Sequence, residues 1–414
     1  MNSPKDMQPT LTDTCGLSTA RVPTRLYTDN AHYELERERI FRRAWLKIGR
    51  VEQLTKAGDY FVKDIAVVDA SVLITRSKGG AIKAFYNVCS HRGNQVVLNT
   101  KGNASRFACR YHSWTYNNTG ELVGVPDEAS FFNLDKKQCG LTPIVVDTWE
   151  GWIFINLKPV PEVTLKEFLG PFGETFSGIE YPHADNALVM RGEFKANWKA
   201  VADAFSEAYH LPSIHPRTFA PVYAGKDNPH CRPLSAHIYG AHRSLSLWLN
   251  PDYQPPAEAK VERWLNPTAS TVTGTRNEAQ VNPLTEHAAV NPTKSANWSS
   301  DVNWIFPNWH LQISANRFWS HEFWPISANT TLWEGRFYQP APKTVRERIQ
   351  LEHFTAQMAD GMLEDLANIE STQRGMASGA KSHLYLQDGE ILLRHALEQV
   401  VRWTEAATVA EALA

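Results

Sequence analysis

Short runs of hydrophobic and polar residues alternate along the chain between about residues 45 and 160. Segments such as DYFVKDIAVV, SVLITR, IKAFYNVC and WEGWIFINL are separated by turns rich in Gly, Asn and Lys. Alternation of this kind between turn residues is typical of short strands. We therefore predict an all-β domain over 45–160. An N-terminal segment over 1–44 precedes it, and helical spacing begins there at 31–45.

The second half of the chain mixes helical and strand patterns. Helical spacing predicts helices over 164–177, 197–210, 343–379 and 390–411, and 187–194 alternates like a strand. Three further strands are predicted in VNWIFPNWHLQIS, RFWSHEFWPI and TTLWEGRFYQP, as an antiparallel meander. Strands followed by long helices predict an α+β domain over 161–414.

Residues 250–300 interrupt this pattern. They are rich in Pro, Asn, Thr and Ala and show little periodicity. We expect a long loop, insertion or lid there, because such loops are often functional. The sequence pattern does not indicate a function for this segment.

Charge and cysteine content narrow the class of protein. The 414 residues hold 42 Lys and Arg against 44 Asp and Glu, so the net charge of −2 gives no footprint for nucleic acid or an anionic membrane. No apolar run is long enough for a membrane helix, and the first thirty residues hold no apolar signal region. Five cysteines argue against a disulfide framework. We expect a cytoplasmic protein in which Cys and His serve metal or redox chemistry.

Two short motifs combine cysteine with histidine. Cys89-Ser-His91 and Cys109-Arg-Tyr-His112 each follow a predicted strand, and seventeen residues separate them. Two such loops brought together form a four-ligand site. Buried but unligated residues, a structural zinc site and a Rieske cluster are all compatible with this pattern. A Rieske cluster takes two Cys on one iron and two His on the other.

A second group of candidate ligands lies in NWKAVADAFSEAYHLPSIHPR, residues 197–217. Asp203, Glu207 and His210 are spaced for one face of a helix, and Pro212 is expected to end that helix so that His215 turns back. A solvated helix face is the simpler interpretation. Two imidazoles and one carboxylate are also the facial triad of non-haem Fe(II) oxygenases.

The first motif pair resembles a known family. CSHRGNQVVLNTKGNASRFACRYHSW is similar to the Rieske motif of ring-hydroxylating oxygenases, including the positions of Arg92, Gly93, Tyr111 and Trp114. The resemblance implies a [2Fe–2S] cluster with Cys89 and Cys109 on one iron and His91 and His112 on the other.

The later segments resemble the mononuclear iron motif of the same family. The resemblance implies His210 and His215 as iron ligands and Glu207 as an acidic bridge to a neighbouring subunit's cluster. In ADGMLEDLANIESTQRGM, residues 359–376, it places the third ligand at Asp365, with Asp360 and Glu364 as competitors and Glu370, Gln373 and Gly375 as landmarks. The chain departs from the family at Asp203-Ala204, where many members have Glu-Asn.

The resemblance also implies a fold and an activity. We expect an antiparallel β-sandwich Rieske domain and a helix-grip catalytic domain with a large antiparallel sheet. The protein would be an alpha subunit of an oxygenase of the EC 1.14 class, taking electrons from a reductase, directly or through a ferredoxin. It would use O2 and Fe(II) to hydroxylate an apolar small molecule, aromatic or alicyclic. A homotrimer is implied, with or without a beta-type subunit.

Three alternatives remain open on the sequence. Mono-oxygenation or oxidative demethylation of a non-aromatic substrate is the second enzymatic interpretation. A Rieske electron-transfer protein without catalysis and a zinc-stabilised binding protein are the others. For a catalytic domain we expect a mostly apolar pocket. Its candidate lining residues are Phe205, Trp304, Trp309 and Phe318 or Trp319.

Overall fold

The chain forms two compact units. The computed structural model describes residues 9–265, 283–315 and 317–414. A β-rich unit contains residues 35–168 together with 406–412. A larger unit contains the described residues up to 34, residues 169–405 and the last two residues.

The β-rich unit is built on two antiparallel sheets. The seven-stranded sheet has the order β2-β11-β10-β5-β4-β3-β6, and the small sheet has the order β7-β8-β9. The strands of the large sheet are β2 (Leu46–Arg50), β3 (Asp59–Ile65), β4 (Ala70–Arg76), β5 (Ile82–Tyr86), β6 (Lys101–Asn103), β10 (Pro143–Trp149) and β11 (Trp152–Asn156). Those of the small sheet are β7 (Arg106–Ala108), β8 (Thr115–Asn117) and β9 (Leu122–Gly124).

The core of this unit lies where the two sheets meet. Aliphatic and aromatic side chains of both sheets pack together there, among them Leu73, Phe85, Phe107 and Tyr116. The same cluster contains two cysteines from loops, Cys89 and Cys109. Burial of aromatic and aliphatic side chains supplies most of the driving force for such packing. It fixes both cysteine loops against one core.

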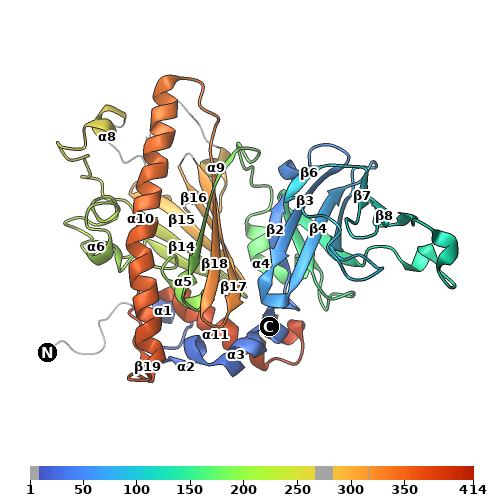
Figure 1. Cartoon of the computed structure of the whole chain (residues 1–414). Coiled ribbons are helices and arrows are strands. Elements are labelled where there is room, and N and C mark those ends of the chain that lie inside the picture. The colour runs from blue at the N-terminus through green and yellow to red at the C-terminus, as the bar shows by residue number, and fades with distance from the viewer. Residues whose placement is uncertain (1–8, 266–282, 316) are drawn as a thin grey trace. The chain divides into compact units, whose positions relative to one another are not determined.

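The larger unit is built on a second antiparallel sheet, with the order β12-β18-β17-β16-β15-β14-β13. Its strands are β12 (Ala187–Phe194), β13 (Ser235–Tyr239), β14 (His242–Trp248), β15 (Trp298–Ile305), β16 (Trp309–Ser314), β17 (Phe318–Ser327) and β18 (Thr330–Tyr338). The long helix α10 (Val345–Ala377) runs along one face of this sheet (Figure 1). Phe337 of β18 and Phe354 of α10 meet edge to face at 5.8 Å. The predicted α+β class with antiparallel sheets is confirmed.

Helix α10 has a well-defined start. Thr344 accepts a hydrogen bond from the backbone N–H of Glu347, and the Glu347 side chain accepts one from the backbone N–H of Thr344. This reciprocal pair satisfies donors that a helix N-terminus otherwise leaves unpaired. Buried residues then recur along one face of the helix, from Phe354 and Met358 to Asp365 and Ile369. The helix thus has a fixed register against the sheet.

Several predicted elements differ from the observed ones. VNWIFPNWHLQIS is not one strand, because Phe306, Pro307 and Asn308 form the turn between β15 and β16, and proline cannot donate to a strand ladder. The helix predicted over 390–411 is α11 (Ile391–Glu405) followed by α12 (Val409–Leu413). The helix predicted over 31–45 is α3 (Asn30–Glu36), which continues as a π-helical turn to Phe41.

The segment expected as a long loop contains short helices. These are α8 (Lys260–Leu265) and α9 (Pro283–Glu286), and β15 already begins at Trp298. Residues 266–282 lie outside the described part of the chain. Among the described residues, no helix has both the length and the apolar character that a membrane crossing requires.

Candidate metal centres

The two Cys-His loops of the β-rich unit share one backbone pattern. The backbone N–H of Gly93 donates to the carbonyl of Cys89 at 2.9 Å, and that of Ser113 donates to the carbonyl of Cys109 at 2.8 Å. Gly93 and Ser113 both have a positive φ, of 73° and 58°. Left-handed backbone is ordinary for glycine and uncommon for serine. In each loop, the backbone therefore makes a sharp turn that is closed by a hydrogen bond between the cysteine and the residue four positions later.

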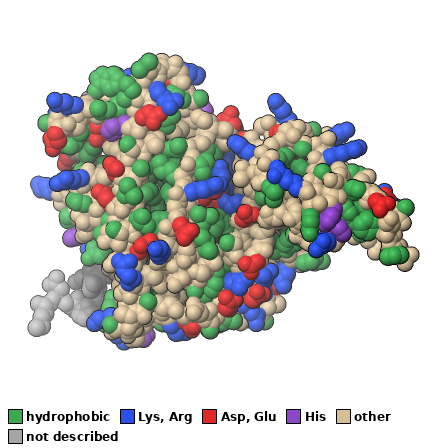
Figure 2. Space-filling view, in the orientation of Figure 1, with side chains coloured by type: hydrophobic (Ala, Val, Ile, Leu, Met, Phe, Trp, Pro, Cys, Tyr) green, Lys and Arg blue, Asp and Glu red, His purple; other side chains and the backbone are tan. Residues whose placement is uncertain are grey.

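The four candidate ligands of these loops point toward one region. The Nδ1 atoms of His91 and His112 lie 3.1 Å apart, while Cys89 and Cys109 are buried in the core below. Figure 2 shows histidine side chains at the surface of this unit, near the end that carries β7 and β8. Two buried sulfurs and two partly exposed imidazoles form the donor set of a Rieske cluster. The residues present fit such a cluster.

Hydrogen-bond donors surround both sulfurs. The Tyr116 hydroxyl donates to Sγ of Cys89 at 3.4 Å, and the Asn94 amide donates to Sγ of Cys109 at 3.6 Å. Burial raises the pKa of the Cys109 thiol, but the backbone N–H of Tyr111 and the Asn94 amide outweigh burial, so the pKa is lowered. Donors of this kind stabilise a thiolate, the form that binds iron.

The other motif residues hold the two imidazoles. Trp114 stacks on His91 with ring centroids 5.0 Å apart, and the Tyr111 ring lies 3.9 Å from that of His112. The Arg92 guanidinium lies over the Tyr111 ring at 5.0 Å. These contacts explain why Arg, Tyr and Trp accompany the ligands in the motif.

In the larger unit, the helix predicted over 197–210 is wrong. Helix α5 (Trp198–Asp203) ends after six residues, and Glu207 and His210 lie in the turns that follow. Asn197 caps its start, and the Ser206 hydroxyl donates to the carbonyl of Ala202 at 2.8 Å. Serine often competes with helical hydrogen bonding in this way. Asp203, Glu207 and His210 therefore do not share a helix face.

The role expected for Pro212 is also wrong. It lies in the first turn of the short helix α6 (Leu211–Ile214), where a missing N–H costs little. The proline therefore begins this helix instead of ending the preceding one. His210 and His215 flank α6, one on each side.

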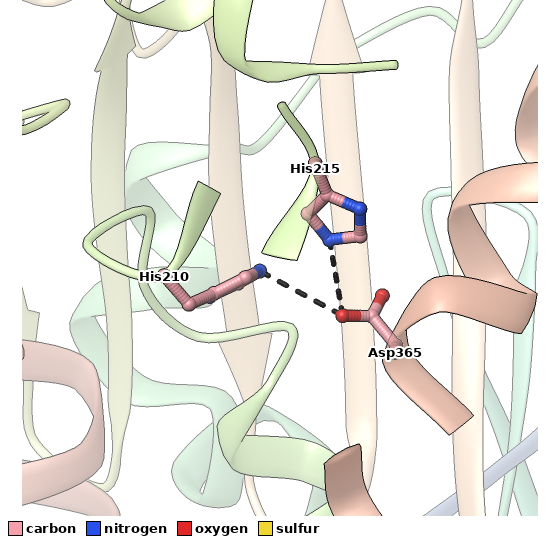
Figure 3. Close-up of side chains that lie close together, drawn as sticks. All are labelled: His210, His215 and Asp365. Carbon is pink, nitrogen blue, oxygen red and sulfur yellow. Dashed lines mark hydrogen bonds and ion pairs between the residues drawn. The ribbon is translucent and has the colours of Figure 1, made fainter. Parts of the chain in front are cut away.

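His210, His215 and Asp365 come together between these turns and α10 (Figure 3). Oδ1 of Asp365 lies 3.0 Å from Nε2 of His215 and 3.8 Å from Nε2 of His210. The potential ligand atoms of the three residues all lie within 4.8 Å of one another. Two imidazoles and a carboxylate converging in this way fit a mononuclear non-haem iron.

The remaining nitrogen of each histidine meets a second carboxylate. Nδ1 of His215 lies 2.6 Å from Glu364, which also accepts from the Thr218 hydroxyl at 2.6 Å. Nδ1 of His210 contacts Glu207. Carboxylates bound to Nδ1 fix the tautomer and leave Nε2 to face a metal. Glu364 was expected only as a competing ligand, and the geometry places it behind His215 instead.

The other acidic candidates lie elsewhere. Asp203 is close to the core, accepts a hydrogen bond from the Tyr27 hydroxyl at 2.7 Å, and has its pKa raised to about 7 by burial. Asp360 is exposed on α10. Gln373 accepts from the backbone N–H of Asn197 at 3.0 Å and so ties α10 to the start of α5. Asp203 and Asp360 thus take no part in the group of three.

A cavity of about 100 Å³ opens beside the three residues. Of the expected lining residues, Phe205 and Trp319 border it, whereas Trp304, Trp309 and Phe318 are fully buried in the core and do not. The lining is mostly apolar and includes Leu247, Val302, Met358 and Met362. Two histidines that the sequence patterns did not single out, His310 and His321, also line it. The signal in the sequence that could have identified them is their position within predicted strands, between aromatic residues.

Comparison with known proteins places both units. Residues 44–148 match the Rieske [2Fe–2S] domain, and residues 174–406, over half of the chain, match the catalytic domain of ring-hydroxylating alpha subunits. The chain belongs to the family of ring-hydroxylating alpha subunits. Members of this family combine a Rieske [2Fe–2S] domain with a catalytic domain that binds mononuclear iron.

Individual relatives of this alpha subunit include enzymes of two kinds. It is 36% identical over 200 residues to the benzene 1,2-dioxygenase alpha subunit of Pseudomonas putida, covering 46% of this chain and 43% of that protein. It is 30% identical over 198 residues to the carnitine monooxygenase oxygenase subunit of Escherichia coli K12, covering 47% and 52%. The matched part thus spans only about half the length of these relatives.

A likeness to a solved structure covers nearly the whole chain. A quaternary ammonium Rieske monooxygenase in complex with an inhibitor superposes with a TM-score of 0.73 at 19% identity, over 95% of this chain and 98% of that one. Similarity at this identity concerns the fold alone.

Proposed function

We propose that this chain is the terminal oxygenase of a Rieske oxygenase system, which uses O2 and electrons from a reductase to hydroxylate an apolar small molecule. One observation carries the proposal. His210, His215 and Asp365 converge from the two sides of a cavity, and the outer nitrogen of each histidine is held by a carboxylate. A facial triad of this kind leaves coordination positions open on one side.

Each residue has a stated part in this proposal. Cys89, Cys109, His91 and His112 hold the [2Fe–2S] cluster, and His210, His215 and Asp365 hold Fe(II). When bound, such an iron supplies the O2 chemistry that protein side chains cannot perform. Glu364 keeps His215 oriented through Nδ1, and Glu207 does the same for His210. Phe205, Val302 and Leu247 exclude water from the apolar side of the cavity.

We further propose that electrons reach the iron from a neighbouring subunit. A reductase, directly or through a ferredoxin, would reduce the cluster, and a homotrimer would bring one subunit's cluster to another's iron, with or without a beta-type subunit. Glu207 would then bridge the two sites. Only 10% of its side chain is exposed, and it already contacts His210, so a partner's histidine would meet a carboxylate linked to the ligand set.

The proposed division of the chain is a Rieske domain over 45–160 and a catalytic domain over 161–414. The proposed setting is cytoplasmic, because all five cysteines are free and a reducing compartment keeps thiolates available to iron. An apolar, aromatic or alicyclic substrate suits the lining. Mono-oxygenation or oxidative demethylation is the second candidate, because relatives of this chain include a mono-oxygenase as well as a dioxygenase.

The test is turnover by the purified, iron-loaded chain with a surrogate reductase under 18O2. Two labelled atoms in a cis-diol support dioxygenation, and one labelled atom or a demethylated product supports the second candidate. About three irons per chain are expected, two in the cluster and one in the triad. About two irons would favour an electron carrier, and a colourless zinc protein would exclude both enzymatic candidates.

The triad itself is tested by His210→Ala. This variant should keep the visible absorption of the cluster and lose turnover, because one of the two imidazole ligands of the triad is gone. Retained turnover at normal iron content would contradict the assignment. Leu363→Ala is a suitable control, because Leu363 is exposed on the same helix as Asp365 and is not among the residues that line the cavity.

A further inference from the structure

Helix α10 has one buried face, and one position on that face carries no side chain. The buried residues of the helix are Phe354, Met358, Gly361, Asp365, Ile369, Gln373 and Met376. Gly361 lies one turn before Asp365, the candidate iron ligand, and between Met358 and Met362, which both line the cavity. A glycine inside a helix is less favourable than an alanine, so a buried one calls for an explanation.

The space over Gly361 is filled by the ring of Phe219. A Cβ atom on Gly361 would lie under 3.0 Å from Cε2 and Cζ of this ring, a separation that real Cβ atoms essentially never show. The phenyl ring therefore occupies the place that a side chain at position 361 would take. Phe219 lines the cavity, whereas Gly361 is not among the lining residues. We call this recess in α10, over Gly361, the Gly361 notch.

Phe219 also packs against a candidate iron ligand. Its ring centroid lies 4.9 Å from that of His215, with 56° between the ring planes. The backbone on both sides of Phe219 is held by hydrogen bonds. The N–H of Ala220 donates to the carbonyl of His215 at 2.9 Å, and the N–H of Val222 donates to the carbonyl of Phe219 at 3.0 Å. Because this backbone is held, a ring forced out of the Gly361 notch has the cavity as the open space beside it.

A second glycine of α10 provides the contrast. Gly375 is exposed, and a Cβ atom there would meet nothing within 4 Å. Any small residue would therefore fit at position 375. At position 361 the helix has no room for even one methyl group unless the Phe219 ring moves. The packing of Phe219, and not the helix itself, thus requires glycine at position 361.

The size of the cavity shows what a displaced ring would do. The cavity has a volume of about 100 Å³. An apolar protein cavity of about 150 Å³ binds one benzene molecule. One six-membered carbon ring is therefore about the largest group that this cavity can hold next to the three candidate ligands. A phenyl side chain that left the Gly361 notch would compete for the same space.

We propose that Phe219 is a specificity-determining residue and that Gly361 is its positioning residue. The Gly361 notch holds the phenyl ring out of the cavity, and the ring then forms the wall that limits the substrate. The substrate class is a molecule whose reacting part is a single aromatic or alicyclic ring without a second fused ring. This inference rests on the proposed function in taking the cavity as the substrate site. It narrows that proposal from any apolar small molecule to one of limited width.

The test compares benzene with naphthalene, which adds a second fused ring. Binding to the iron-loaded full chain is measured without O2 or reductant, by headspace gas chromatography of the hydrocarbon above the solution. The wild type should bind benzene more tightly than naphthalene, although naphthalene has the larger apolar surface to bury. Gly361→Ala should bind benzene roughly tenfold less tightly than the wild type, because the added methyl group displaces the phenyl ring into the cavity.

Two changes at Phe219 separate positioning from structure. The double variant Gly361→Ala/Phe219→Leu should regain benzene affinity to within about threefold of the wild type, because leucine lacks the two ring atoms that meet the methyl group. Phe219→Ala should raise the affinity for naphthalene relative to benzene by roughly tenfold, because the wall recedes. Phe219→Leu should change this ratio less, in the same direction, and it provides the measurement if Phe219→Ala does not fold.

Gly375→Ala is the matched control, since it adds the same methyl group to the same helix in open space. It should bind both hydrocarbons as the wild type does and melt at or above the wild-type temperature, because alanine favours a helix. A purely structural Gly361 would give a different result. Gly361→Ala would then melt at a lower temperature while the folded protein bound benzene with wild-type affinity.

Four outcomes would overturn the inference: tighter binding of naphthalene than of benzene by the wild type, wild-type benzene affinity in Gly361→Ala, no recovery in the double variant, or an unchanged affinity ratio in Phe219→Ala. The proposed oxygenase function has its own readout, 18O in the product, and fails independently. An enzyme that hydroxylated fused-ring hydrocarbons with the same selectivity in the wild type and the Phe219 variants would retain the proposed function and lose this inference.

Discussion

The carboxylate of Glu364 lies 2.6 Å from Nδ1 of His215. It lies next to Asp365 on α10, so one turn of helix presents one carboxylate to each nitrogen of the same imidazole. The outer carboxylate selects the tautomer that leaves Nε2 unprotonated for a metal. The two neighbouring acids of α10 therefore have different roles, Glu364 on Nδ1 of His215 and Asp365 on Nε2.

Glu364→Gln should weaken mononuclear iron binding by roughly 10- to 100-fold, the usual cost of losing a carboxylate behind a ligating histidine. Competition with a chelator measures the change, and the visible absorption of the cluster should stay the same. Glu352→Gln is the matched control, because Glu352 lies exposed on the same helix and pairs with Arg348. Iron affinity equal to that of wild type would refute the role of Glu364.

Loaded with excess iron, Glu207→Gln should keep both metals and block electron transfer between them, because the amide cannot accept hydrogen bonds with both oxygens as the carboxylate does. Reoxidation of the reduced cluster in a single turnover measures the transfer rate. Full coupled activity in this variant would refute the bridging role. Loss of iron would show that holding His210 is the main part played by Glu207.

Tyr116→Phe should lower the reduction potential of the cluster by on the order of 50 mV, the equivalent of about one hydrogen bond for a one-electron couple. The lost bond is the one that the hydroxyl donates to Sγ of Cys89. Donors to a cluster sulfur favour the reduced, more negative state. Protein-film voltammetry gives the potential, and Tyr86→Phe provides a control in the same unit. An unchanged potential would count against this bond.

Acid should destabilise the larger unit below about pH 6.5. Burial lowers the pKa of His321 and of His395 to about 3, so the folded protein keeps both neutral while the unfolded chain takes up protons near pH 6.5. The stability from these groups is complete above pH 6.5 and is lost as pH falls toward 3. At pH 5 the loss is about 2 kcal/mol per histidine. Asp203 offsets part of it, since its pKa is raised to about 7 and acid neutralises it in place.

Melting temperatures at pH 7 and pH 5 test this effect. His395→Gln can keep a donor toward the carbonyl of Gly240, which His395 contacts at 2.9 Å, but cannot titrate. The variant should lose less stability than the wild type between the two pH values, and iron loss on acidification is common to both proteins. An identical loss would contradict the burial effect at His395.

The local motifs of the β-rich unit could be predicted from sequence, because their chemistry is encoded within a few residues. Each cysteine and its histidine lie two or three residues apart, and alternation marks the strands that carry them. The same locality explains the error over 197–210. Helical spacing continues across residues where the Ser206 hydroxyl donates to the backbone, and the hydrophobic periodicity does not reveal a side-chain hydrogen bond of that kind.

The catalytic unit depends on contacts that sequence spacing does not contain. Asp365 lies 150 residues from His215, so the resemblance to a family was needed to single it out among three neighbouring acids. The stack of Trp304, His310 and His321 joins three strands, and only the register of the sheet brings these rings together. The position of a histidine in a strand pattern does not indicate whether its ring nitrogens have hydrogen-bond partners.

The backbone segments that carry the three candidate ligands differ in rigidity. Asp365 belongs to a 33-residue helix whose start is capped and whose far end is tied through Gln373, whereas His210 and His215 sit in short turns around a four-residue helix. A bound metal ion would therefore link the flexible turns around α6 to the rigid helix α10. Hydrogen–deuterium exchange should slow over 204–219 when iron is added and stay constant along α10, so metal loading itself would shape the wall of the cavity.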